Sequence, residues 1–102
     1  MPFPHSGDQR AWDARTRLWG LEVGIEAETR PTDVQALERR LASKLGDGAV
    51  ERLILALADT RWNRSLVADL GDALSLVPIR GQAAMEAIRA RDDPGASVLI
   101  VT

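Results

Sequence analysis

The chain has 102 residues with a formal net charge of −2, and 45% of its residues are hydrophobic. These proportions are those of an ordinary globular protein and not of a disordered or a membrane protein. Cysteine is absent from the sequence, which excludes disulfide frameworks and thiolate metal sites and agrees with a reducing compartment. The negative charge argues against a protein that coats nucleic acid, although a local basic strip remains compatible with it.

The length predicts a single domain over residues 9–102, preceded by a flexible N-terminal segment over residues 1–8, and the strand and helix patterns below make that domain α/β. Pro2, Pro4 and Gly7 interrupt that segment. No apolar run is long enough to cross a bilayer, and the first residues lack the basic and apolar regions of a signal peptide. We therefore expect a cytoplasmic protein without a membrane partner.

The stretch from Trp12 to Gln35 is predicted to form two strands of a hairpin followed by a helix. Residues 21–29 alternate between an apolar and an acidic face, which is the period of a half-buried strand. The acidic face carries Glu22, Glu26 and Glu28. Residues 12–18 repeat the alternation more weakly, and only Trp19-Gly20 separates the two runs.

The turn between the two strands sets their register. A two-residue turn places Leu18 opposite Leu21 and, further along, Asp13 opposite Glu26. Directly opposite residues have Cβ atoms roughly 4.5 to 5.5 Å apart, so two carboxylates would face each other. The alternative is a bulge, because Trp-Gly is not a preferred turn pair and a bulge would slip the register.

The acids Asp13, Glu26 and Glu28 have two explanations. They would repel one another unless they hold a hard cation such as magnesium, which prefers oxygen ligands. Alternatively, they form the solvated face of an antiparallel hairpin, with nearby arginines as counter-ions. Those arginines are Arg15, Arg17 and Arg30.

The same residues carry a resemblance to a known family. Asp13 in AWDA is followed by Glu26-Ala27-Glu28 on the second strand and by Gln35 in DVQALERR at the start of a helix. This order resembles the PD-(D/E)xK nuclease-like superfamily. More closely, GDQRAWDA followed by GIEAETRPTDVQALERRLASKL is similar to the C-terminal domain of some bacterial Xre-type helix-turn-helix regulators.

The resemblance implies a site for magnesium or manganese. Asp13 and Glu26 would bind the metal, and the carbonyl of Ala27 would assist. Glu28 stands where the superfamily usually has a lysine that helps to activate water, a substitution found in some active members and in inactive relatives. Gln35 would be an active-site contact, or it serves only as a helix cap.

Lys44 is the only lysine of the chain. In some members of the superfamily the catalytic lysine comes from the helix after the hairpin. Here Lys44 follows Gln35 by about nine residues, roughly 13 Å along a helix axis, so we do not expect it to reach the acids.

The resemblance leads to two hypotheses on function. The first is a degenerate or weakly active metal-dependent DNA phosphodiesterase, associated with transcription regulation or DNA processing. The second is a non-catalytic oligomerisation or interaction module of a bacterial regulator.

A helix is predicted after Pro31. Thr32 would be its N-cap, with Gln35 at the capping-box spacing. An apolar stripe follows, which should pack on the apolar face of the hairpin. The stripe consists of Val34, Leu37, Leu41 and Leu45. Four basic residues are candidates for contacts with DNA phosphates or are simply solvated. They are Arg30, Arg39, Arg40 and Lys44.

Strands and helices alternate in the rest of the chain. LILALA predicts a strand covered on both faces, in a central and parallel position. TRWNR would begin the next helix, at the sheet edge where open α/β sheets bind ligands, or it is only a helix start with a half-buried Trp62. Asp92-Asp93-Pro94-Gly95 predicts a turn and not a metal site. The expected elements are a strand within 50–58, a helix from Asp59 or Thr60 to Leu74, a strand over 76–79, a helix over 81–91 and a strand over 97–102.

The predicted fold is ββαβαβαβ, with an antiparallel hairpin joined to parallel strands by βαβ crossovers. By resemblance it is restriction-endonuclease-like without the first helix and strand. Either the chain begins inside that domain, or a second copy or partner chain supplies the missing sheet edge. A flavodoxin-like three-layer sheet is the competing architecture.

Overall fold

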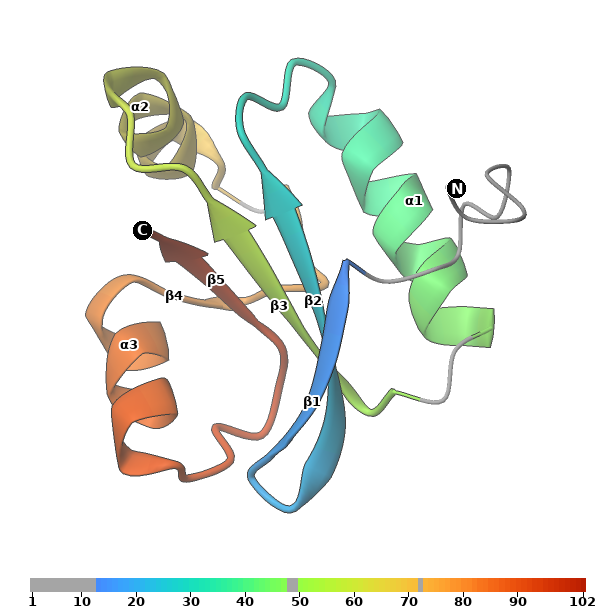
Figure 1. The fold of residues 1–102 in the computed structure, drawn as a ribbon. Coiled ribbons are helices and arrows are strands. Elements are labelled where there is room, and N and C mark those ends of the chain that lie inside the picture. Colours follow the sequence, from blue (N-terminus) through green and yellow to red (C-terminus); the bar gives the residue numbers. More distant parts are fainter. Residues whose placement is uncertain (1–12, 48–49, 72) are drawn as a thin grey trace, which may run out of the picture.

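The computed structural model describes residues 13–47, 50–71 and 73–102, and the predicted N-terminal segment 1–8 lies outside them. Within the described residues the elements follow the predicted order ββαβαβαβ and form a small α/β domain (Figure 1). They are β1 (Ala14–Leu18), β2 (Leu21–Glu28), α1 (Val34–Asp47), β3 (Arg52–Leu57), α2 (Arg61–Asp69), β4 (Ile79–Arg80), α3 (Gly81–Ala90) and β5 (Val98–Val101). None of these helices is long and apolar enough to cross a membrane.

The β1–β2 hairpin has the predicted register, with Leu18 opposite Leu21. Trp19 and Gly20 both have positive φ, 60° and 73°, as a two-residue hairpin turn of type I′ requires. Trp19 holds this unfavourable backbone because its indole Nε1 donates to the carbonyl of Ala87 at 3.1 Å. The alternative of a bulge is therefore wrong.

The five strands form one mixed sheet in the order β1-β2-β3-β5-β4. The hairpin pair is antiparallel, whereas β2, β3, β5 and β4 are parallel to their neighbours. β3 occupies the predicted central position. The chain crosses from β2 to β3 to β4 in one direction and returns from β4 to β5. Because such crossovers share one hand, the returning helix must lie on the opposite face of the sheet.

The two faces have separate cores. α1 and α2 cover a leucine-rich core that includes Leu37, Leu41 and Leu55, whereas α3 covers a smaller core that includes Val23 and Ala84 (Figure 1). The apolar face of the hairpin therefore packs on α3, and the prediction that the first helix covers it is wrong. α1 lies instead on the acidic face of β2, because the crossover to β3 takes it to that side.

Local signals set most element boundaries. α1 is capped by Asp33, whose Oδ1 accepts from the N–H of Ala36 at 3.0 Å, so the predicted cap at Thr32 is wrong. The sequence allows either Asp59 or Thr60 to cap α2, and the structure shows that Thr60 does, since its hydroxyl accepts from the N–H of Asn63 at 3.1 Å. α2 ends at Asp69, five residues before the predicted Leu74.

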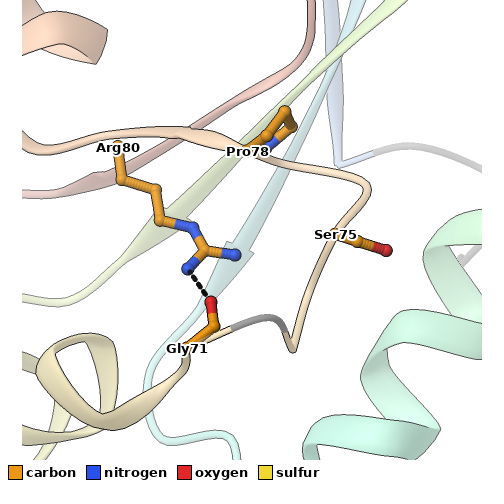
Figure 2. A pocket seen from close by; sticks show the side chains of 4 residues that line it. All are labelled: Gly71, Ser75, Pro78 and Arg80. Atoms are coloured by element: carbon orange, nitrogen blue, oxygen red, sulfur yellow. Dashed lines mark hydrogen bonds between the residues drawn. The ribbon is translucent and has the colours of Figure 1, made fainter.

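Arg80 organises the connection between α2 and β4. Its guanidinium donates to the carbonyls of Gly71, Ala73, Leu74 and Val77 at 2.6 to 3.2 Å. Figure 2 shows Arg80 reaching back to Gly71 across a cavity of about 460 Å³ that Ser75 and Pro78 also line. These bonds replace the helical ones that the predicted extension of α2 would have made, and β4 begins only at Ile79.

The turn between α3 and β5 follows the predicted turn chemistry. Asp93 Oδ1 accepts from the N–H of Gly95 at 2.9 Å, and the guanidinium of Arg52 lies 3.0 Å from Asp93 Oδ2. The Gly95 N–H, with a smaller contribution from Arg52, holds the pKa of the Asp93 carboxyl below its ordinary value.

Asn63 joins the loops that follow β2 and β3. Its side chain is fully buried, and Nδ2 donates to the carbonyl of Thr29 at 2.7 Å and to that of Ala58 at 2.8 Å. Oδ1 is buried without a hydrogen-bond partner among the described residues. Asn63 therefore fixes the first turn of α2 to the segment after β2.

We expect Asn63→Ala to lower the free energy of unfolding by about 1 to 3 kcal/mol, because the carbonyl of Thr29 loses its side-chain donor and that of Ala58 keeps only the N–H of Thr60. Ser65→Ala, on the exposed side of the same helix, should change it by less than about 0.5 kcal/mol. Urea denaturation followed by circular dichroism measures both. Equal stability of the two variants would show that the Asn63 side chain does not hold the two loops together.

Candidate acidic site

The hairpin brings Asp13 and Glu26 together as predicted. The N–H of Asp13 donates to Glu26 Oε2 at 3.2 Å, and Asp13 Oδ2 accepts from the N–H of Ala27 at 2.9 Å. These reciprocal bonds link the start of β1 to the end of β2. The two carboxylates are thus held by backbone donors, which offset part of their repulsion.

Lys44 reaches this pair, contrary to the sequence-based expectation. Its Nζ lies 2.6 Å from Glu26 Oε2, and the exposed fractions of the Lys44 and Glu26 side chains are 6% and 3%. The expectation was wrong because it took the distance from Gln35 to Lys44 along the helix as the distance from the acids to Lys44. α1 runs back along β2 in the opposite direction, so its last turns pass over the middle of the strand (Figure 1).

A second ion pair lies beside the first. Arg40 donates to Glu28 Oε2, in a more exposed position than the Glu26–Lys44 pair. Four residues of helix rise about 6 Å and two residues of strand rise about 6.6 Å, so the spacings match. We call Glu26, Glu28, Arg40 and Lys44 the ion-pair ladder.

The ladder changes the interpretation of the acidic face. Glu26 is buried under α1, and the expectation of a uniformly solvated face is wrong for it. Among the described residues, Arg15 and Arg17 form ion pairs with Glu22 alone, each at 3.4 Å.

The remaining predicted site residues lie apart from the acids. Gln35 and Arg39 are exposed on α1, and no hydrogen bond or ion pair among the described residues joins them to Asp13 or Glu26. Arg30 stacks on the indole of Trp62, with its guanidinium carbon 4.1 Å from the ring centroid. Of the four basic candidates for DNA contacts, Arg40 and Lys44 are thus engaged with the protein's own acids.

The sequence-based interpretation missed the ladder and the Arg30–Trp62 contact. A signal for the ladder exists, since acids two residues apart on a strand match cations four apart on the next helix. No comparable signal joins Arg30 to Trp62, because the contact depends on how the loops after β2 and β3 meet.

Among the described residues, no group of three or more histidine, cysteine, aspartate or glutamate residues could hold a metal ion. Asp13 and Glu26 still provide two carboxylates beside the Ala27 backbone, and magnesium is commonly held by one or two carboxylates with several waters. The residues fit a two-carboxylate site, provided that the cation displaces Lys44 from Glu26 Oε2.

Comparison with known proteins does not decide whether the acids hold a metal ion or form ion pairs alone. No family model matches the chain, no curated protein matches it, and no solved structure matches its fold.

We expect Lys44→Met to lower the free energy of unfolding by about 3 to 5 kcal/mol at neutral pH, because it leaves Glu26 buried without a counter-ion. The double variant Lys44→Met, Glu26→Gln should recover much of that loss, since no charge remains buried. The matched control is Arg40→Met, which breaks the more exposed pair and should cost below about 1 kcal/mol. Urea denaturation measures the free energy of unfolding of all three variants. Equal losses for Lys44→Met and Arg40→Met would contradict the expected difference between the buried and the more exposed ion pair.

Proposed function

We propose that the chain is a PD-(D/E)xK-like domain acting as a weakly active, degenerate metal-dependent DNA phosphodiesterase in transcription regulation or DNA processing. The observation that supports it is the meeting of Asp13, Glu26 and Lys44, with Lys44 Nζ 2.6 Å from Glu26 Oε2. Two acids and a lysine are the residue types that the superfamily uses. Under this proposal, the five-stranded mixed sheet would belong to a restriction-endonuclease-like fold.

In this proposal Lys44, and not Glu28, is the charged residue that acts beside the metal-binding acids. Glu28 is tied to Arg40, whereas Lys44 contacts the same carboxylate that would bind a metal. Magnesium or manganese, held by Asp13, Glu26 and the Ala27 carbonyl, would supply Lewis-acid activation of a phosphate and of a water. The ammonium of Lys44 would then offset the charge of the phosphate.

The same geometry accounts for weak activity. Glu26 is 3% exposed and already paired, so a hydrated cation has to break a buried ion pair before it binds. The proposal therefore predicts a slow enzyme in which α1 opposes loading of the site.

We expect slow, manganese-dependent cleavage of end-labelled DNA by the wild-type protein and none by the double variant Asp13→Ala, Glu26→Ala. Glu22→Gln is the matched control, because it removes an acid of β2 that pairs with Arg15 and Arg17 away from the site. Gel analysis of single- and double-stranded substrates over hours measures the rates. Equal cleavage by wild type and double variant, or cleavage by neither, contradicts the activity.

A second candidate function is a non-catalytic oligomerisation or interaction module. The observation in its favour is β1, an edge strand in which every residue except Leu18 is exposed. An exposed edge can pair with a strand of another chain.

For this candidate, size-exclusion chromatography with light scattering should give a dimer that dissociates on dilution. Arg15→Pro places a proline on the edge strand and should return the protein to a monomer, because proline opposes further strand pairing. A wild-type monomer at high concentration would contradict the candidate.

A further inference from the structure

Trp62 stands out at the start of α2. Among the described residues it is the one exposed large hydrophobic side chain, with 47% of its surface accessible. Arg30 lies over one face of its ring, at 4.1 Å from the centroid. A guanidinium that stacks by its face keeps its N–H groups, which lie in the guanidinium plane, available for an anion. No carboxylate of the described residues forms an ion pair with Arg30.

The pair is held by bonds between the two loops. Trp62 Nε1 donates to the carbonyl of Pro31 at 3.4 Å, and Asn63 Nδ2 donates to that of Thr29 at 2.7 Å. The residues on either side of Arg30 are thus bonded to the first turn of α2. This arrangement presents the indole and the guanidinium together as one unit, which we call the Arg30–Trp62 platform.

The platform and the acids lie at the same end of the sheet. The C-terminal ends of the parallel strands β2 and β3 lie at the same end of the sheet, and α2 begins there (Figure 1). Arg30 follows Glu26 by four residues, so at a strand rise of about 3.3 Å the two are roughly 13 Å apart. A stacked DNA strand rises about 3.4 Å per nucleotide, so about four nucleotides span that distance.

The charges near the platform favour an unpaired strand over a duplex. Arg61 adds a second exposed cation, whereas Arg64 is paired with Asp59. Duplex binding depends on many phosphate contacts, which a chain with a net charge of −2 does not offer in quantity. Stacking of a base on an aromatic ring contributes affinity without surplus charge, but it requires a base whose face is free.

We propose that the Arg30–Trp62 platform binds single-stranded DNA, with one base stacked on the exposed indole surface and an adjacent phosphate on Arg30. The proposal rests on the proposed function for its link to Asp13 and Glu26, because the bound strand would run from the platform to the acids. Binding itself needs neither metal nor cleavage, so the two proposals fail independently.

The test is fluorescence anisotropy with a labelled oligothymidylate of about 12 nucleotides, in EDTA and at roughly 50 mM salt. Trp62→Ala should weaken binding roughly 5- to 150-fold, the loss of one stacked base, whereas Trp62→Phe should retain most of it. Arg30→Gln should reduce the slope of log affinity against log salt by about 0.7, the release of one counter-ion from a single strand. Arg89→Gln on α3 is the matched loss of one positive charge and should change neither value.

Several outcomes overturn the proposal. They are absence of binding by the wild type, equal or tighter binding of a duplex, unchanged affinity of a folded Trp62→Ala, and an equal effect of Arg89→Gln and Arg30→Gln. Thermal denaturation by circular dichroism checks that each variant is folded. Binding that persists in a protein without nuclease activity would leave the platform in place and refute only the activity.

Discussion

The buried ion pair between Glu26 and Lys44 is the constraint on which the arrangement of α1 depends. Both side chains are almost fully removed from water, at a cost that only close pairing offsets. A shift of α1 along or around its axis would leave a charge buried alone. The pair therefore fixes the register of the helix on β2 more sharply than the leucine contacts, which tolerate small movements.

The same pair connects stability with chemistry. Asp13 and Glu26 are brought together by the hairpin register and would destabilise the sheet if they were uncompensated. Backbone donors and Lys44 supply the compensation. An acid pair that is neutralised by the protein's own lysine is stable without metal, and under the proposed function a cation would have to displace Lys44 before it binds. The proposed weak activity would follow from this compensation of the Glu26 charge by Lys44.

Polar side chains also fix the irregular parts of this small domain. Arg80 binds four carbonyls in the connection between α2 and β4, and Asn63 binds two in the loops after β2 and β3. These loops carry backbone groups that no strand or helix satisfies, so side chains have to do it. As a result, the end of the sheet that carries the Arg30–Trp62 platform is held in one arrangement.

The order of the elements, the register of the hairpin and the central position of β3 could all be predicted from the amino-acid sequence. These features follow from local signals: a period of two, a two-residue turn, and an apolar run covered on both faces. The meeting of Asp13 with Glu26 followed from the register alone. The cap at the start of α2 and the Asp93 turn could also be predicted, because each depends on neighbours within a few residues.

The face of the sheet that α1 covers, and therefore the partners of the acids, depends on the packing of whole elements and could not be predicted from local patterns. The apolar pattern of β2 suggested one side, but the hand of the crossover to β3 imposes the other. Lys44 then meets Glu26, and the only sequence signal for that contact is the matched spacing of the acids on β2 and the cations on α1. The contacts of Asn63, Arg80 and Trp62 were hidden for the same reason: each joins loops whose approach is set by the packing of whole elements, and local preference carries no information about it.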